Sequence, residues 1–186
     1  EIGGGTIECA GISRGGIVAA ASVLIGGNKF DMAIMEHIRR KYGLAVGERT
    51  AEDIKIKIGS AMYLTEKLEM EVKGRDMVTG LPRLITVTSD DVTDAIQNEL
   101  EGIIQTAKDV LYQTPPELSA DVMDKGMILS GGSSQLRNMA ELLAQATGVP
   151  AFVADEPMFA VVKGVGIVLE NLDAYKRSIL GAGNRR

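Results

Sequence analysis

Two glycine-rich bends restrict this chain more than any other feature of its sequence. They are the runs Gly3–Thr6 and Ser130–Ser134, the second of which follows the apolar residues Met127–Leu129. Consecutive glycines let backbone N–H groups approach a phosphate closely, and a strand–loop–helix junction adds the positive end of a helix dipole. Each bend equally suits a tight turn that binds no ligand. Neither is a Walker loop or a dinucleotide fingerprint, because the required Gly-Lys-Ser/Thr ending and GxGxxG spacing are missing.

The composition indicates a globular protein rather than a nucleic-acid-binding or disulfide-linked one. Hydrophobic residues make up 45% and charged residues 24% of the 186 residues, enough for one domain or two small lobes. The formal charge of -5 argues against nucleic acid as a partner, because phosphate backbones favour a basic face. Cys9 is the single cysteine, which excludes an internal disulfide and fits a reducing cytoplasm.

Hydrophobic patterning predicts a β-hairpin followed by helices and strands. Apolar runs over 6–13 and 17–25, joined by a Gly-Gly turn, predict the hairpin. Helices are expected over 28–42, 50–59, 89–113, 117–125, 135–146 and 159–180, with Asn28, Thr50 and Ser89 as N-caps. Further strands are expected over 68–72, 84–88, 127–130 and 149–154, and a loose tail over 183–186.

Two side chains are interpreted as structural. His37, the only histidine, lies in a predicted helix beside Arg39 and Arg40, so we expect a solvated residue rather than a ligand or base. Cys9 is expected to be a small core residue of the first strand.

Several motifs resemble, in the same order, those of the MreB family of bacterial actins. They are IGGGTIE (2–8), GGNKFD (26–31), IRRKY (38–42), GERTAEDIK (47–55), GRDMVTGLPR (74–83), QTPPEL (113–118), LSGG (129–132), EP (156–157) and VKGVG (162–166). The resemblance is collinear from residue 2 to about residue 175. Because the sequence begins without Met inside the first bend, we expect a fragment, the C-terminal half of such a protein.

The resemblance implies an α/β fold. It is an actin-like, ribonuclease H-like ATPase lobe with a mixed sheet, flanking helices and a smaller inserted α+β subdomain. Residues 1–27 and 101–180 would form subdomain IIA, and residues 28–100 would form the inserted subdomain IIB. The first lobe, with subdomains IA and IB and the family's membrane-binding element, would lie outside this chain.

The resemblance also implies a site for ATP and Mg²⁺. The β- and γ-phosphates would lie against Gly3, Gly4, Gly5 and Thr6. Glu8 would orient the attacking water, although a polar residue at a strand edge is the alternative. Glu1 stands where the family often has Asp, near Mg²⁺ and its water shell. The base, ribose and adenosine contacts would be Glu52, Lys55, Ile56, Gly131, Gly132, Ser133 and Ser134.

Ser133 departs from a position that is usually Gly in the family. If the backbone there has a positive φ, Ser costs about 1 kcal/mol.

The implied protein is an ATP-binding, filament-forming bacterial actin that organises cell-wall synthesis and maintains rod shape. Its slow ATP hydrolysis would be coupled to polymerisation, and the isolated chain is expected to be inactive and to bind nothing tightly. Partners would be further copies, through longitudinal contacts of subdomain IIB, and the cell-wall synthesis machinery. The protein would be cytoplasmic, at the inner face of the plasma membrane. A non-polymerising ATPase of the same superfamily, of the chaperone or sugar-kinase type, is the alternative.

Overall fold

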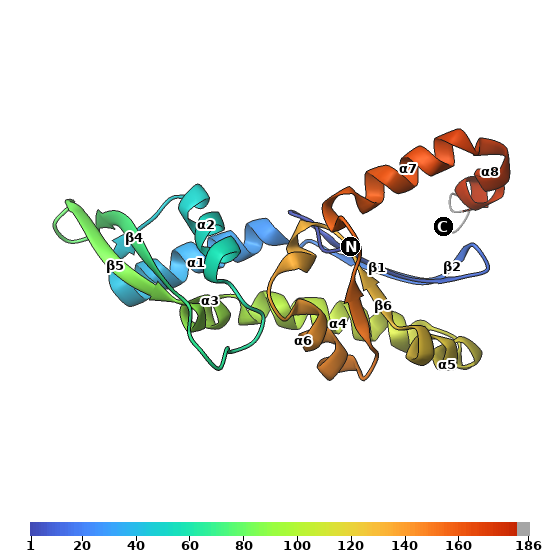
Figure 1. Cartoon of the computed structure of the whole chain (residues 1–186), viewed down its shortest axis with the longest axis horizontal. Helices are drawn as coiled ribbons and strands as arrows, with labels where there is room; N and C mark the ends of the chain where they lie inside the picture. The colour runs from blue at the N-terminus through green and yellow to red at the C-terminus, as the bar shows by residue number, and fades with distance from the viewer. Residues whose placement is uncertain (182–186) are drawn as a thin grey trace.

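The computed structural model describes residues 1–181 and shows an elongated molecule of mixed helices and strands (Figure 1). In chain order the elements are β1 (Ile7–Ser13), β2 (Gly16–Val23), α1 (Gly27–Tyr42), β3 (Leu44–Ala45), α2 (Glu48–Ile58), β4 (Glu69–Asp76), β5 (Pro82–Thr88), α3 (Ser89–Ala95), α4 (Gln97–Gln113), α5 (Pro116–Lys125), β6 (Met127–Leu129), α6 (Met139–Thr147), β7 (Ala151–Val153), α7 (Ala160–Glu170) and α8 (Leu172–Gly181). Short 3₁₀ turns, η1 (Gly132–Gln135) and η2 (Pro157–Phe159), precede α6 and α7.

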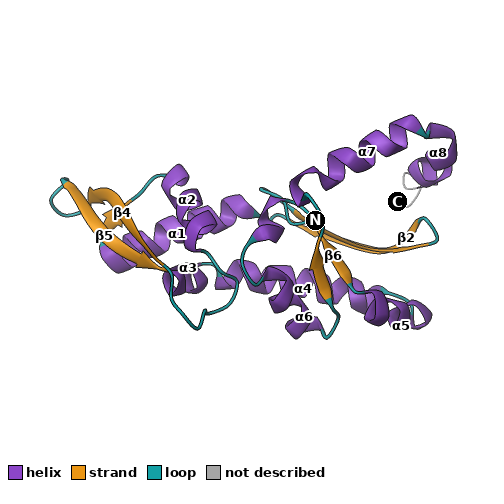
Figure 2. Ribbon diagram, viewed as in Figure 1, coloured by secondary structure: helices purple, strands orange, loops and turns teal. Residues whose placement is uncertain are grey.

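The strands form three small sheets, which Figure 2 shows in orange. β1 and β2 form the predicted antiparallel hairpin, and β3, β4 and β5 form a second antiparallel sheet at the opposite end of the molecule. β6 and β7 pair in parallel. α1 runs lengthwise between the glycine bends and the β4–β5 hairpin, so it connects the two ends (Figure 1).

The core is aliphatic and centres on α1. Phe30, Ile34 and Ile38 lie four residues apart on one face of this helix and are buried, because residues at this spacing share a side. They pack with Ile54 of α2 and Val92 of α3, and the same buried cluster continues into α4 and α6. The position of α1 is therefore fixed along most of its length.

Element boundaries differ from the predicted ones where tertiary contacts decide them. The helix predicted over 89–113 is two helices, because Ile96 leaves the helical conformation (φ -98°, ψ 8°) and its buried side chain joins the core. Thr88 rather than Ser89 caps α3, and the N-caps of α1 and α2 are Gly26 and Gly47 rather than Asn28 and Thr50.

Three further expectations differ or stay open. The helix expected from Gln135 begins at Met139 after a 3₁₀ turn, and the last helix is divided at Asn171. Cys9 is half-buried rather than a core residue. The predicted loose tail, 183–186, lies outside the described residues, and within residues 1–181 no helix is long and apolar enough to cross a membrane.

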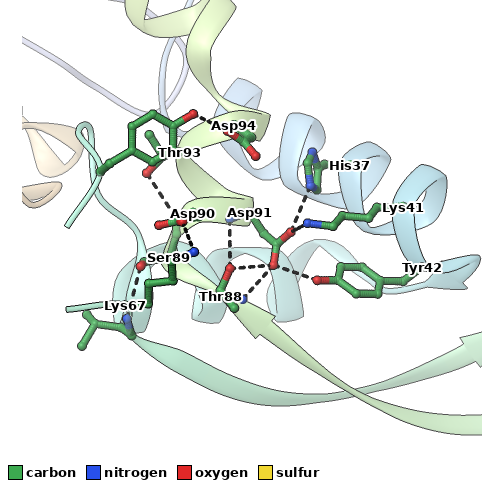
Figure 3. A network of polar contacts seen from close by, with 12 residues as sticks. His37, Lys41, Tyr42, Lys67, Thr88, Ser89, Asp90, Asp91, Thr93 and Asp94 are labelled. Carbon is green, nitrogen blue, oxygen red and sulfur yellow. Dashed lines mark hydrogen bonds and ion pairs between the residues drawn. The ribbon is translucent and has the colours of Figure 1, made fainter. Parts of the chain in front are cut away.

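A buried carboxylate fixes the far end of α1 (Figure 3). Asp91 of α3 is 2% exposed and accepts hydrogen bonds from Lys41, from Tyr42 at 2.8 Å, and from the backbone N–H and hydroxyl of Thr88 at 2.8 and 2.9 Å. Its own N–H donates to the Thr88 hydroxyl, which completes a capping box. Burial alone would raise the pKa of Asp91, but the bonds from Lys41, Thr88 and Tyr42 hold it well below its usual range.

His37 belongs to this network, so the expectation of a solvated histidine is wrong. It is 8% exposed, and its Nε2 lies 3.3 Å from Asp91 Oδ1. Since a carboxylate only accepts, Nε2 carries the proton, and Nδ1 is buried without a hydrogen-bond partner. His37 is therefore part of the packing that joins α1 to α3.

Replacing Asp91 with Asn should destabilise the chain by about 2 kcal/mol, because bonds to a charged acceptor are replaced by weaker ones. The folded-state pKa is lowered, so the stabilisation is present above the unfolded-state pKa of about 4 and is lost as the pH falls. Urea unfolding between neutral pH and pH 2 measures this: the native chain should lose more stability than Asp91→Asn.

The matched control is Asp94→Asn, since Asp94 is an exposed residue of the same helix that accepts from Tyr63. Its effect should stay within about 0.5 kcal/mol. Equal losses for the two variants would contradict the assigned role of Asp91.

Candidate functional site

The first glycine bend packs against the start of α1. The N–H of Gly27 donates to the carbonyl of Gly3 at 3.0 Å, and the N–H of Asn28 donates to the carbonyl of Gly4 at 2.8 Å. A Cβ on Gly26 would lie 2.7 Å from the carbonyl oxygens of both Gly3 and Gly4, closer than real Cβ contacts. Glycine at position 26 is therefore what allows the bend to approach the helix.

The second bend contacts the first. Ile2 donates its N–H to Ser130 O at 2.7 Å and accepts at its carbonyl from Ser133 N at 3.0 Å, while the Ser133 hydroxyl donates to Gly3 O at 3.0 Å. Gly131 has φ +86°, and a Cβ there would lie 2.4 Å from Ile2 O. Both bends thus form one backbone-lined site, although they are 130 residues apart in sequence.

Ser133 does not have a positive φ, so the backbone strain that a serine would suffer in that conformation does not arise. In the described part of the chain the non-glycine residues with positive φ are Arg14, Asn138 and Glu156. Ser134 is fully buried, and its hydroxyl donates to Gly131 O at 2.7 Å, which supports the bend from inside. Gly132 is exposed on the outer surface of the bend.

The first bend retains unused donors. Gly4, Gly5 and Thr6 are exposed, and within residues 1–181 their N–H groups donate to no other residue. Adjacent backbone N–H groups near a helix N-terminus form an environment that favours an anion.

α2 brings three predicted residues alongside. Lys55 Nζ reaches the first residue of α1, where it donates to Gly27 O at 3.2 Å. Glu52 and Ile56 are exposed, and their spacing to Lys55 places all three on neighbouring positions of one helix face. Lys55 also contacts Asp31 of α1, a residue the sequence did not indicate as part of the site. The signal for Asp31 was its place four residues after Gly27, one helical turn away.

The two predicted carboxylates, Glu1 and Glu8, line one cavity. Glu8 is exposed on β1, and its N–H donates to Glu1 O at 3.0 Å. Both residues line a cavity of about 880 Å³ between β1, α4, α5 and β6, which the glycine bends do not line. The sequence-predicted catalytic role of Glu8 stays a prediction.

Glu1 fits the outer coordination of a cation. Its Oε2 is buried without a hydrogen-bond partner, and a Cβ on Gly131 would lie 3.0 Å from its Oε1. The described residues contain no group of three or more His, Cys, Asp or Glu that could hold a metal. Mg²⁺ commonly keeps several of its waters and tolerates such an outer-sphere carboxylate.

Comparisons with known proteins decide the family. The family model described as MreB/Mbl protein matches residues 1–177. The chain belongs to the MreB/Mbl family. It is 49% identical over 180 residues to the cell shape-determining protein Mbl of Bacillus cereus, and 46% identical over 175 residues to the cell shape-determining protein MreB of Escherichia coli. These alignments cover 97% and 94% of this chain but 54% and 50% of the relatives, so this MreB/Mbl chain spans about half their length.

Solved structures confirm the actin-like fold that the family resemblance implied. MreB5 of Spiroplasma citri bound to AMPPNP matches with a TM-score of 0.88 at 34% identity, over 95% of this chain and 53% of that one. The MamK double helical filament matches with a TM-score of 0.67 at 21% identity, over 86% of this chain and 49% of that one.

Gly26→Ala should separate the first bend from α1, because the new Cβ would meet backbone atoms that cannot rotate away. We expect a loss of about 1–3 kcal/mol in unfolding free energy. The control is Gly47→Ala: Gly47 is also a helix N-cap, but a Cβ there meets nothing within 4 Å. Chemical denaturation of both variants measures the difference, and equal losses would show that the bend does not need the close approach.

Proposed function

We propose that this chain is one lobe, the C-terminal half, of an ATP-binding and filament-forming protein that organises cell-wall synthesis and maintains rod shape. The observation that carries the proposal is the meeting of two distant glycine bends at the start of α1. The exposed N–H groups of Gly4, Gly5 and Thr6 and the positive end of the α1 dipole lie together there. This arrangement suits the negative charge of phosphates.

The proposed nucleotide contacts are those that the family resemblance implies. Gly3–Thr6 bind the β- and γ-phosphates, Gly131–Ser134 lie beneath the adenosine, and Glu52, Lys55 and Ile56 border the base and ribose. MreB5, at 34% identity, was crystallised with AMPPNP and with ADP, which supports a nucleotide as the ligand.

The carboxylates serve the slow hydrolysis of ATP that accompanies polymerisation. Glu8 orients the attacking water, since a carboxylate accepts a hydrogen bond from the nucleophile. Glu1 would lie near Mg²⁺, which would supply charge that neutralises the phosphates; the buried Oε2 of Glu1, which has no hydrogen-bond partner, supports this position.

Self-association uses the inserted subdomain IIB, residues 28–100, while residues 1–27 and 101–180 form subdomain IIA. The loop between β4 and β5 supports this surface, because Met77, Val78 and Leu81 are 45%, 93% and 65% exposed. MamK, which shares the fold, forms a double helical filament. Contacts with the cell-wall synthesis machinery, at the inner face of the cytoplasmic membrane, belong to the whole protein.

Titration of the ¹⁵N-labelled chain with ATP and Mg²⁺ tests the nucleotide site. We expect amide shifts at Gly3–Thr6 and Gly131–Ser134, with a dissociation constant on the order of 1 mM because the contacts of the other lobe are missing. Pyrophosphate should shift the first bend only, and adenosine the second bend only. Shifts confined to other residues, or none at millimolar ATP, would refute the assignment.

Val78→Asp tests the assembly surface in a protein that carries this chain together with a first lobe. A charge placed in an apolar contact must be desolvated, so the critical concentration for ATP-dependent pelleting should rise roughly tenfold. Met123→Asp, at an exposed apolar residue of α5, is the control and should pellet normally. Unchanged pelleting of Val78→Asp would exclude the loop from the contact.

A further inference from the structure

An ion pair at the start of α1 joins Lys55, one of the proposed nucleotide contacts, to Asp31, which is not one of them. Lys55 Nζ is 2.8 Å from Asp31 Oδ1 and donates a hydrogen bond to Asp31 Oδ2 at 3.0 Å. The side chains of Lys55 and Asp31 are only 13% and 12% exposed. Two charges this far removed from water persist together because each compensates the desolvation of the other.

The pair lies at the point where both bends meet α1. Besides Asp31, Lys55 Nζ bonds the carbonyl of Gly27 at 3.2 Å. A Cβ on Gly27 would lie 3.3 Å from this nitrogen and 2.7 Å from the Ser133 hydroxyl. Gly27 also donates to Gly3 O, so the ammonium, the second bend and the first bend all converge on one glycine.

Asp31 determines where the ammonium lies. The contacts of Lys55 Nζ are made with the Asp31 carboxylate and one carbonyl. Without the carboxylate, Lys55 would either be a buried cation with no counter-charge or turn toward solvent, and in both cases its bond to Gly27 weakens. Burial raises the pKa of Asp31 while Lys55 counteracts part of that rise, so each partner depends on the other.

We propose that Asp31 is a positioning residue: it holds the Lys55 ammonium against Gly27 and so fixes the first glycine bend for its ligand. The pair also ties α2 to the start of α1. Because α1 bonds the first glycine bend, α2 and that bend keep one relative position. The effect on a nucleotide rests on the proposed function, whereas the effect on the bend does not.

Amide hydrogen exchange of the 186-residue chain tests the bend directly. The N–H groups of Gly27 and Asn28 report on it, because they donate to Gly3 and Gly4. Asp31→Asn should speed their exchange roughly tenfold, while Val72 in the β4–β5 sheet keeps its native rate. Lys55→Gln should give the same acceleration, and the double variant should add nothing further, since both changes remove one interaction.

Two controls separate positioning from general stability. Glu36→Gln removes an exposed ion pair with Arg39 on the same helix and should leave every rate unchanged. Asp31→Glu keeps the charge and should restore slow exchange at Gly27 and Asn28. The proposal is overturned by unchanged exchange at these two amides in Asp31→Asn, or by an equal acceleration throughout the chain.

The ATP titration is then repeated with the variants. Asp31→Asn should raise the dissociation constant for ATP roughly tenfold, and Glu36→Gln should not change it. If the native chain shows no ATP-induced shifts, the proposed function fails, but the exchange rates still decide the role of Asp31. If ATP binds Asp31→Asn with native affinity, the positioning role for the ligand is refuted.

Discussion

The site depends on hydrogen bonds between the first glycine bend and the N-terminus of α1. These backbone bonds, from Gly27 to Gly3 and from Asn28 to Gly4, form only because Gly26 has no side chain in the way. The N–H groups of Gly27 and Asn28 are thus used by carbonyls of the bend. The N–H groups of the exposed residues Gly4, Gly5 and Thr6 are left for another acceptor. The second bend contacts the first through the Ser133 hydroxyl, which donates to Gly3 O. The two bends therefore form one site only in the folded chain, because they are distant in sequence.

α1 carries this arrangement into the rest of the lobe. Its first turn contacts both bends, and its last turn is fixed by the Asp91 network and by bonds to the β4–β5 hairpin, where Arg83 donates to Tyr42 O and Met77 donates to Gly43 O. Its middle is packed by Phe30, Ile34 and Ile38. The exposed loop of that hairpin and the glycine bends are therefore joined by a single well-packed helix.

Local patterns in the sequence were sufficient for part of this structure. The hairpin, the position of most helices and the two bends follow from glycine spacing and apolar periodicity, and the family resemblance supplied the fold that the comparisons confirm. The failures involve partners distant in sequence. His37 was expected in solvent because its acceptor, Asp91, is 54 residues away, and the role of Asp31 depends on Lys55, 24 residues away. The break at Ile96 likewise depends on the core that its side chain enters.

In the proposed site the two bends share one nucleotide. A crystal structure of a protein that contains this chain and a first lobe, grown with AMPPNP and Mg²⁺, tests it most directly. We expect phosphate oxygens within hydrogen-bond distance of the backbone N–H groups of Gly4, Gly5 and Thr6, and the adenosine against Gly131 and Gly132. A triphosphate that lies away from either bend would contradict the account.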